Sequence, residues 1–124
     1  MYELTTIVDF EAAHRLPEYP GKCNRLHGHN WKVEVTVAGD QLDQLGMLID
    51  FKELKQILSG IIGTLDHYYL NEIEPFCTIN PTAENIARYI YEKLQTALMD
   101  INRVKVQMVK VWESPHSAAV YRED

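Results

Sequence analysis

Two segments in the first third of the chain alternate between apolar and polar positions with the period of a β-strand. In the first, one parity is mostly apolar and carries Leu4, Thr6, Val8, Phe10 and Ala12. In the second, apolar residues again occupy every other position, at Trp31, Val33, Val35 and Val37. Because successive side chains of a strand point to opposite faces, both segments are predicted to be strands with one buried face.

Helical spacing replaces this alternation in the middle of the chain. A first helix is predicted with Asp50 as its N-cap and Glu53 completing a capping box, and its apolar positions are Phe51, Leu54, Leu58 and Ile61. A second helix is predicted within residues 80–99, with Pro81 early in it. Its apolar stripe consists of Ile86, Ile90, Leu94, Ala97 and Leu98.

Two further strands are predicted in the segments VKVQMVKVW and AAVY, close to the C-terminus. The order β-β-α-α-β-β indicates an α+β fold in which two helices cover one face of a four-stranded antiparallel sheet. The whole chain, 1–124, is expected to form a single domain. Residues 65–81, between the helices, have no sustained period, and a connection of this length often carries function.

Composition restricts the classes of function. The 124 residues are 46% hydrophobic and 24% charged, which is typical of a globular protein, and no segment approaches the ~20 apolar residues needed to cross a bilayer. The net charge of −6 argues against a nucleic-acid or anionic membrane surface, although a small anionic ligand stays possible. No signal peptide is visible, so we expect a cytoplasmic location, with Cys23 and Cys77 as separate thiols.

The segment KCNRLHGHNW, residues 22–31, places His27 and His29 two positions apart. In extended chain two such side chains leave the same face with Cα atoms about 6.5 Å apart, so both can reach one metal ion. Gly28 between them lets the backbone bend or approach closely without a side-chain clash. His14 has the parity of the apolar face of the first segment. If the two strands pair antiparallel, all three histidines converge under the helix layer.

Three nitrogen donors without an obvious fourth ligand resemble a catalytic zinc site, which keeps one coordination position open. The alternative is structural, with His14 as a capping or core histidine and His-Gly-His as a turn. An isolated His-x-His pair favours that alternative, whereas the matching parity of His14 and the nearby Cys23 favour metal binding. We therefore predict Zn²⁺ bound by His14, His27 and His29.

Motifs along the chain are similar to those of one protein family. FEAAHRLP, KCNRLHGHNW, GMLIDFKELK, LDHYYLN, NPTAENIA and VWES occur in this order in the 6-pyruvoyl-tetrahydropterin synthase superfamily. The spacing Cys-x3-His-Gly-His, from Cys23 to His29, resembles its 6-carboxytetrahydropterin synthase branch, which acts in queuosine biosynthesis. The animal pyruvoyl enzymes have a longer gap there. The similarity covers nearly the whole chain.

The resemblance implies a T-fold, in which the sheets of several subunits join edge to edge into a barrel, here a homohexamer of two trimers. A four-stranded sheet agrees with such an assembly, because its two edge strands must be paired or covered. The resemblance also implies a zinc-dependent carbon–carbon lyase. Its expected substrate is 7,8-dihydroneopterin triphosphate, which becomes 6-carboxy-5,6,7,8-tetrahydropterin with loss of triphosphate and acetaldehyde.

The same resemblance implies roles for further residues. Cys23 is expected to be the catalytic base, because a nearby cation or histidinium lowers the pKa of a thiol toward neutrality. Asp66 and His67 match the family's proton-relay pair, which serves the cysteine across a subunit boundary. Glu113 is expected to accept two N–H bonds from the pterin edge, and Thr82 matches a second contact to that ring.

Structural interpretations stay open for several of these residues. Adjacent side chains diverge on strands and on helices, so Asp66 need not orient His67 directly, and the pair also suits a solvated turn. Thr82 also suits the start of a helix. Cys77 has no neighbours like those of Cys23 and is interpreted as a small buried hydrophobe.

The sequence leaves three matters undecided. Ser114 and His116 stand where the family often has a threonine-containing sequence, which can change the grip on the pterin. The triphosphate contacts cannot be chosen among the available cations Arg15, Lys22, Arg25 and Lys52. The alternative functions are a pyruvoyl-type synthase, which keeps the three-carbon side chain, and a non-catalytic zinc- or pterin-binding module. The combination of Cys23 with the Asp-His pair argues against the module, because binding alone needs no thiol base.

Overall fold

A computed structural model describes residues 1–124. Its elements follow in the order β1 (Tyr2–His14), β2 (His27–Gly39), α1 (Phe51–Ile62), α2 (Ala83–Ala97), β3 (Lys105–Ser114) and β4 (Ser117–Tyr121), with short 3-10 turns at Lys22–Asn24 and Leu70–Glu72. The predicted order β-β-α-α-β-β is therefore confirmed. Neither α-helix is long and apolar enough to cross a membrane.

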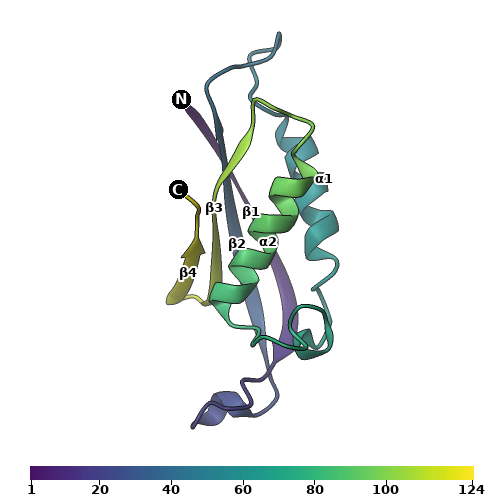
Figure 1. Cartoon of the computed structure of the whole chain (residues 1–124), viewed down its shortest axis with the longest axis vertical. Coiled ribbons are helices and arrows are strands. Elements are labelled where there is room, and N and C mark those ends of the chain that lie inside the picture. The colour runs from purple at the N-terminus through teal and green to yellow at the C-terminus, as the bar shows by residue number, and fades with distance from the viewer.

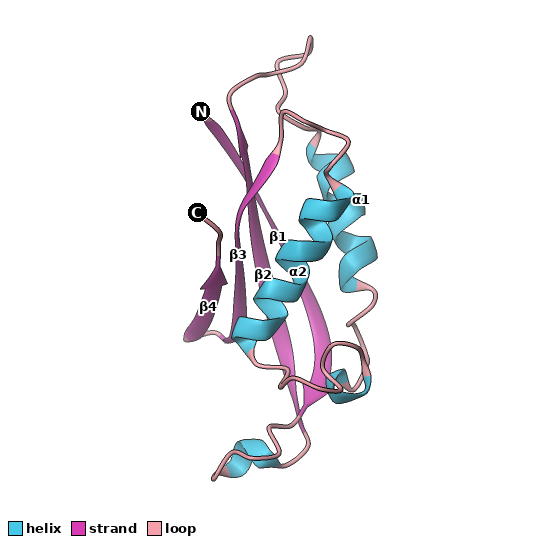
Figure 2. Ribbon diagram, in the orientation of Figure 1, coloured by secondary structure: helices cyan, strands magenta, loops and turns pink.

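The four strands form one antiparallel sheet in the order β1-β2-β3-β4. Both helices lie against the same face of this sheet, and the opposite face has no helix over it (Figures 1 and 2). The connection between β1 and β2 projects beyond one end of the sheet (Figure 1). The layers agree with the arrangement predicted from the sequence.

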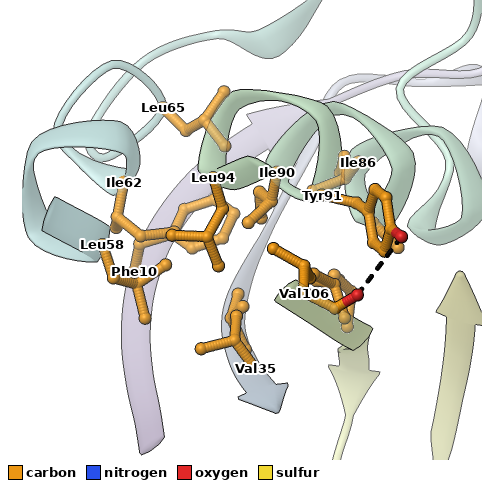
Figure 3. Close-up of a cluster of buried hydrophobic side chains, with 14 of the residues drawn as sticks. Phe10, Val35, Leu58, Ile62, Leu65, Ile86, Ile90, Tyr91, Leu94 and Val106 are labelled. Atoms are coloured by element: carbon orange, nitrogen blue, oxygen red, sulfur yellow. Dashed lines mark hydrogen bonds between the residues drawn. The ribbon is translucent and has the colours of Figure 1, made fainter. Parts of the chain in front are cut away.

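The core lies between the sheet and the helices. The apolar parity of β2 and β3 is buried there, with Val33, Val35, Val109 and Val111 inaccessible to solvent. The helices contribute Leu54, Leu58, Ile62, Ile86, Ile90 and Leu94, several of which are drawn in Figure 3. Burying each such side chain contributes about 1.5–3 kcal/mol, so this layer contact fixes the position of the strands that carry the candidate site.

The helix boundaries are set by side-chain caps. Asp50 accepts a hydrogen bond from the backbone N–H of Lys52 at 2.8 Å and starts α1, although Glu53 makes no return bond. Phe51, predicted to be on the apolar stripe, is half exposed, and Ile62 is buried in its place. Thr82 accepts from the backbone N–H of Asn85 and starts α2.

Pro81 therefore lies outside α2, before the N-cap, and not within the helix as predicted. The reason is local, because the hydroxyl of Thr82 takes the backbone N–H that would otherwise be unpaired in the first turn. Its position outside the helix leaves the carbonyl of Pro81 free to bond elsewhere, and it bonds to His14.

The outer edge of β1 is covered at one end only. The segment 66–71 runs beside it, where Ala13 donates to the carbonyl of Tyr68 at 3.2 Å and His67 donates to the carbonyl of Glu11 at 2.6 Å. Nothing pairs with the outer side of β1 before Glu11, and β4 is the other end strand. The sheet therefore presents two open edges that another chain can pair with.

Candidate metal centre and active site

Three histidines converge at one end of the sheet, on the face that the helices cover. The antiparallel register places His14 opposite His27 and Ala12 opposite His29, so the three side chains share one face. Their coordinating atoms all lie within 4.8 Å of one another, and the Nε2 atoms of His14 and His27 are 3.0 Å apart. Strand β2 begins at His27, so both of its histidines belong to the strand.

Backbone carbonyls orient two of these rings. The Nδ1 of His14 bonds to the carbonyl of Pro81 at 2.8 Å, and the Nδ1 of His27 bonds to the carbonyl of Arg25 at 2.7 Å. A histidine that donates Nδ1–H to a carbonyl presents a lone pair at Nε2, which is the usual arrangement in a metal site. The Nε2 of His29 is buried and has no hydrogen-bond partner. These nitrogen donors fit a divalent metal ion such as zinc.

Burial favours the neutral form of the imidazoles. It is the largest influence on the pKa of both His14 and His29, which it lowers, while the charge of Glu113 acts in the opposite direction. Trp31 is fully buried beneath them, with its ring centroid 5.0 Å from that of His14 and 5.1 Å from that of His29. Because the neutral forms of His14 and His29 are favoured, these two side chains can bind a cation without first losing a proton.

Glu113 lies against the same cluster. Its two carboxylate oxygens are 3.9 Å from the Nε2 of His14 and 4.0 Å from the Nε2 of His29. Sequence reasoning assigned this glutamate to the pterin and missed its closeness to the histidines. A signal was available, because Glu113 has the parity of Val109 and Val111, the buried face of β3.

Asp66 and His67 touch each other directly, a contact that the sequence did not require. The Nδ1 of His67 is 3.0 Å from Oδ1 of Asp66, and the same oxygen accepts the backbone N–H of Glu11 at 2.9 Å. His67 has a left-handed backbone with φ of 65°, which turns its ring back toward the preceding residue. The N–H bond from Glu11 is the main reason that the pKa of Asp66 is below its ordinary value.

The Asp-His pair is not on the metal side of its own chain. The Nε2 of His67 lies 3.5 Å from the carboxylate of Glu11, whose position on β1 has the parity opposite to that of His14. His67 also lines a hollow at the β1 edge whose other walls include Glu11, Ala13, Gly28 and Asn30, together with Ala12 and His29 of the opposite parity. Glu11, which the imidazole contacts, alternates with His14 along β1, so this contact lies on the helix-free side of the sheet.

Comparison of the sequence with known proteins identifies the family of this chain. The family model described as 6-pyruvoyl tetrahydropterin synthase matches residues 3–124. The chain belongs to this family. The resemblance inferred from the sequence motifs is thereby confirmed.

Relatives within the family carry a more specific name. The chain is 39% identical to a 6-carboxy-5,6,7,8-tetrahydropterin synthase of Bacillus subtilis, over 98% of this chain and 85% of the relative. It is 43% identical to the enzyme of the same name from Synechocystis, over 90% of this chain and 86% of the relative.

Solved structures of the family share the fold. The 6-pyruvoyl tetrahydropterin synthase of Caenorhabditis elegans superimposes with a TM-score of 0.88 at 31% identity, covering 99% of this chain and 96% of that one. The Plasmodium falciparum protein, at 21% identity, superimposes with a TM-score of 0.75 over 98% and 97% of the two chains. The predicted T-fold of the subunit is confirmed.

Cys23 and the Asp-His pair, which the family resemblance also singles out, are not among the grouped histidine ligands. Cys23 is half-buried in the short 3-10 turn of the projecting β1–β2 connection, and it is not among the grouped coordinating side chains. Its carbonyl accepts from the backbone N–H of Leu16 at 2.7 Å, which holds the two arms of this connection together. Within one chain neither the thiol nor the Asp-His pair makes a hydrogen bond or ion pair with the metal ligands.

Three interpretations made from the sequence can now be assessed. Thr82 acts as the N-cap of α2, as its helix-start interpretation requires, and its hydroxyl retains one O–H for another partner. Cys77 is exposed, so its interpretation as a buried hydrophobe is wrong. It lies in the turn-rich segment between η2 (Leu70–Glu72) and α2, where partial desolvation and Glu74 raise the pKa of its thiol. Gly28 is extended within β2, and an added Cβ there would meet nothing within 4 Å, so neither a bend nor a close approach requires glycine at this position.

Proposed function

We propose that this chain is a 6-carboxy-5,6,7,8-tetrahydropterin synthase. It would convert 7,8-dihydroneopterin triphosphate and one water molecule to 6-carboxytetrahydropterin, acetaldehyde and triphosphate. The observation that supports it is the set of three converging histidines, two of them oriented by backbone carbonyls and the third, His29, with a buried and unpartnered Nε2. The names of its relatives and the spacing from Cys23 to His29 support the carboxy-type product.

Zinc is the metal that we assign to His14, His27 and His29, because structural chemistry pairs Zn²⁺ with three imidazoles and an open position in catalytic sites. When bound there, it would hold the side-chain oxygens of the substrate and acidify the adjacent C–H and O–H groups as a Lewis acid. The backbone carbonyls of Pro81 and Arg25 keep the ligand rings in place during turnover.

Proton transfer falls to Cys23 and His67 in this proposal. Cys23 would take a proton from the substrate side chain as thiolate. His67, held by Asp66 at 3.0 Å, would return or relay protons, and a carboxylate in this position also stabilises the imidazolium that results. Glu113 would accept the N–H groups at the pterin edge, and Thr82 would offer an O–H to the same ring.

The site is proposed to be shared between subunits. The imidazole of His67 contacts Glu11 on the helix-free side of the sheet, whereas the metal ligands of its own chain face the helices, and this placement favours a relay pair supplied by a neighbouring chain. Open edges at β1 and β4 allow another copy to pair there. We infer a homohexamer of two trimers, with His67 acting in a neighbour's site. Cytoplasmic location and a role in queuosine biosynthesis stay predictions of the family resemblance.

The product decides between this function and its alternatives. Purified protein loaded with zinc is incubated with 7,8-dihydroneopterin triphosphate, and products are identified by mass together with an acetaldehyde assay. Acetaldehyde in a one-to-one ratio with 6-carboxytetrahydropterin supports the proposal. A 6-pyruvoyl pterin without acetaldehyde would assign the chain to the pyruvoyl type, and binding without turnover would leave a non-catalytic module.

A further inference from the structure

The orientation of His14 depends on a backbone group far along the chain. Its Nδ1 bonds to the carbonyl of Pro81 at 2.8 Å, across 67 residues of sequence. Both partners are buried, and the side chain of His14 is only 1% exposed. A neutral imidazole that donates from Nδ1 presents a lone pair at Nε2, where a metal binds. The direction of the Pro81 carbonyl therefore decides which nitrogen of His14 is available to the metal.

A tight turn sets the direction of this carbonyl. The ring of Pro81 fixes its φ angle, and the backbone N–H of Thr82 donates to the carbonyl of Asn80 at 2.9 Å. A hydrogen bond between residues two apart closes a γ-turn, here centred on Pro81. The turn precedes the first residue of α2, so it belongs to no helix or strand that would hold it in place.

Asn85, in the first turn of α2, bonds to both neighbours of Pro81. Its side-chain Nδ2 donates at 2.8 Å to the carbonyl of Asn80, the same oxygen that closes the γ-turn. Its backbone N–H donates to Oγ1 of Thr82 at 3.1 Å. Apart from His14, it is the only residue whose side chain bonds to the backbone of residues 80–82. The amide of Asn85 thus ties the turn to the helix.

We propose that Asn85 is a positioning residue of the metal centre, which acts on His14 through the carbonyl of Pro81. Its amide holds the carbonyl of Asn80, this carbonyl closes the γ-turn, and the turn aims the Pro81 carbonyl at Nδ1 of the ligand. Every residue has a backbone carbonyl, so a side chain beside the turn is needed to control this one. The role requires an N–H donor at position 85, which a carboxylate lacks. The inference rests on the metal site of the proposed function and not on its reaction.

Metal affinity gives the first test. Zinc binding is measured by competition with a chromophoric chelator for the wild type, Asn85→Asp, Asn85→Ala and the control Asn102→Asp. An acidic residue suits the first turn of a helix, so Asn85→Asp removes the donor without disfavouring α2, and Asn85→Ala removes it without adding charge. Asn102 is an exposed amide in the α2–β3 connection, so its variant makes the same chemical change away from the site.

We expect both Asn85 variants to bind zinc about tenfold more weakly than the wild type, at the low end of the loss seen for groups outside the ligand shell. The control should stay within twofold of the wild type. Equal affinity in all four proteins, together with loss of zinc in His27→Ala, would overturn the inference and leave the metal site of the proposed function intact.

The tautomer of His14 in the metal-free protein gives the second test. Histidine ring nitrogens are labelled with ¹⁵N, and their chemical shifts are recorded above the ordinary histidine pKa of 6.5 and well below the melting temperature. The His14 signals are identified by their absence in His14→Gln. We expect one tautomer, protonated at Nδ1, in the wild type and in Asn102→Asp, and a mixture of both tautomers in the two Asn85 variants. A purely structural role of Asn85 would lower the melting temperature and leave the tautomer unchanged, and that result would overturn the inference.

Discussion

The carboxylate of Asp66 lies 3.0 Å from the Nδ1 of His67, its neighbour in sequence, because His67 has a left-handed backbone. A left-handed conformation costs an L-residue roughly 1–2 kcal/mol, although asparagine and histidine tolerate it better than most. Backbone strain of this kind concentrates at functional sites. The contact holds one imidazole nitrogen and leaves the other exposed toward the hollow that includes Glu11.

Substitution at position 67 should separate activity from stability. His67→Asn keeps a residue that tolerates the left-handed backbone, so its melting temperature should match that of the wild type. Turnover should fall by roughly 10²–10⁴, the usual effect of removing a positioned acid or base. His67→Val provides the contrast, because a β-branched side chain there should destabilise the fold by about 1–2 kcal/mol. Wild-type turnover in His67→Asn would exclude the imidazole from the mechanism.

Asp66 should make stability dependent on pH on the acid side. Its folded pKa is lowered, so its contribution to the free energy of unfolding is fully present above the ordinary carboxyl value of 3.8 and is lost as pH falls through the folded pKa. Asp66→Asn should therefore be less stable than wild type at neutral pH, and the difference should shrink below pH 3.8. Denaturation of the metal-free proteins as a function of pH measures this. A difference that stays constant into the acid range would contradict it.

Each of the three histidine ligands should be required for zinc binding. His27 supplies an Nε2 that lies 3.0 Å from that of His14, and removing it leaves only two imidazoles. We expect about one zinc per chain in wild type and a large loss in His27→Ala, measured by elemental analysis after dialysis. His116→Ala, which alters an exposed histidine of the β3–β4 turn, is the control and should retain its zinc. Equal zinc in all three would remove the assigned site.

Much of the histidine cluster was predictable because strand geometry is local. Side chains two apart on a strand share a face, and antiparallel pairing brings the end of one strand beside the start of the next. His14, His27 and His29 follow from these two rules alone. The layer arrangement was predictable for the same reason, since the apolar parity of each strand had to face the helices.

Other parts of the site depend on contacts that no local pattern reports. The carbonyl of Pro81 reaches His14 across 67 residues of sequence, and it does so because Thr82 ends the loop where it caps α2. The contact between Asp66 and His67 needs a positive φ at a residue other than glycine, which the sequence does not signal. Phe51 was wrongly predicted to lie on the buried face of α1, because helical spacing indicates the apolar stripe of a helix but not which residues lie at the edges of that stripe.

Gly39 should be one of the least replaceable residues for folding. A Cβ added there would lie 2.1 Å from the carbonyl oxygen of Arg103 and 2.6 Å from Leu48, so backbone would have to move. We expect Gly39→Ala to destabilise the protein by about 1–3 kcal/mol, the range of overpacked sites. Gly60→Ala, in α1 with nothing within 4 Å, should stabilise by up to about 1 kcal/mol because alanine favours helix. Chemical denaturation compares them, and equal stability of both variants would contradict the steric argument.

The last prediction concerns the sharing of the site between subunits. Cys23→Ala should keep its zinc and fold, because the thiol is not among the grouped metal ligands, and turnover should fall by roughly 10²–10⁴. His67→Ala should lose turnover in the same way. If each site combines the cysteine of one chain with the relay pair of another, hybrids of the two inactive variants contain some sites with both residues intact.

Mixing the two variants therefore distinguishes a shared site from a self-contained one. The subunits are exchanged by mild denaturation and dialysis with zinc, and exchange is verified by mass spectrometry of the assembly with one variant isotopically labelled. Partial recovery of turnover is expected, because some sites then carry Cys23 from one parent and His67 from the other. The double variant, Cys23→Ala with His67→Ala, mixed with either single variant gives the baseline. No recovery above that baseline after verified exchange would mean that each chain supplies its own relay, against the placement of His67 on the helix-free side of the sheet.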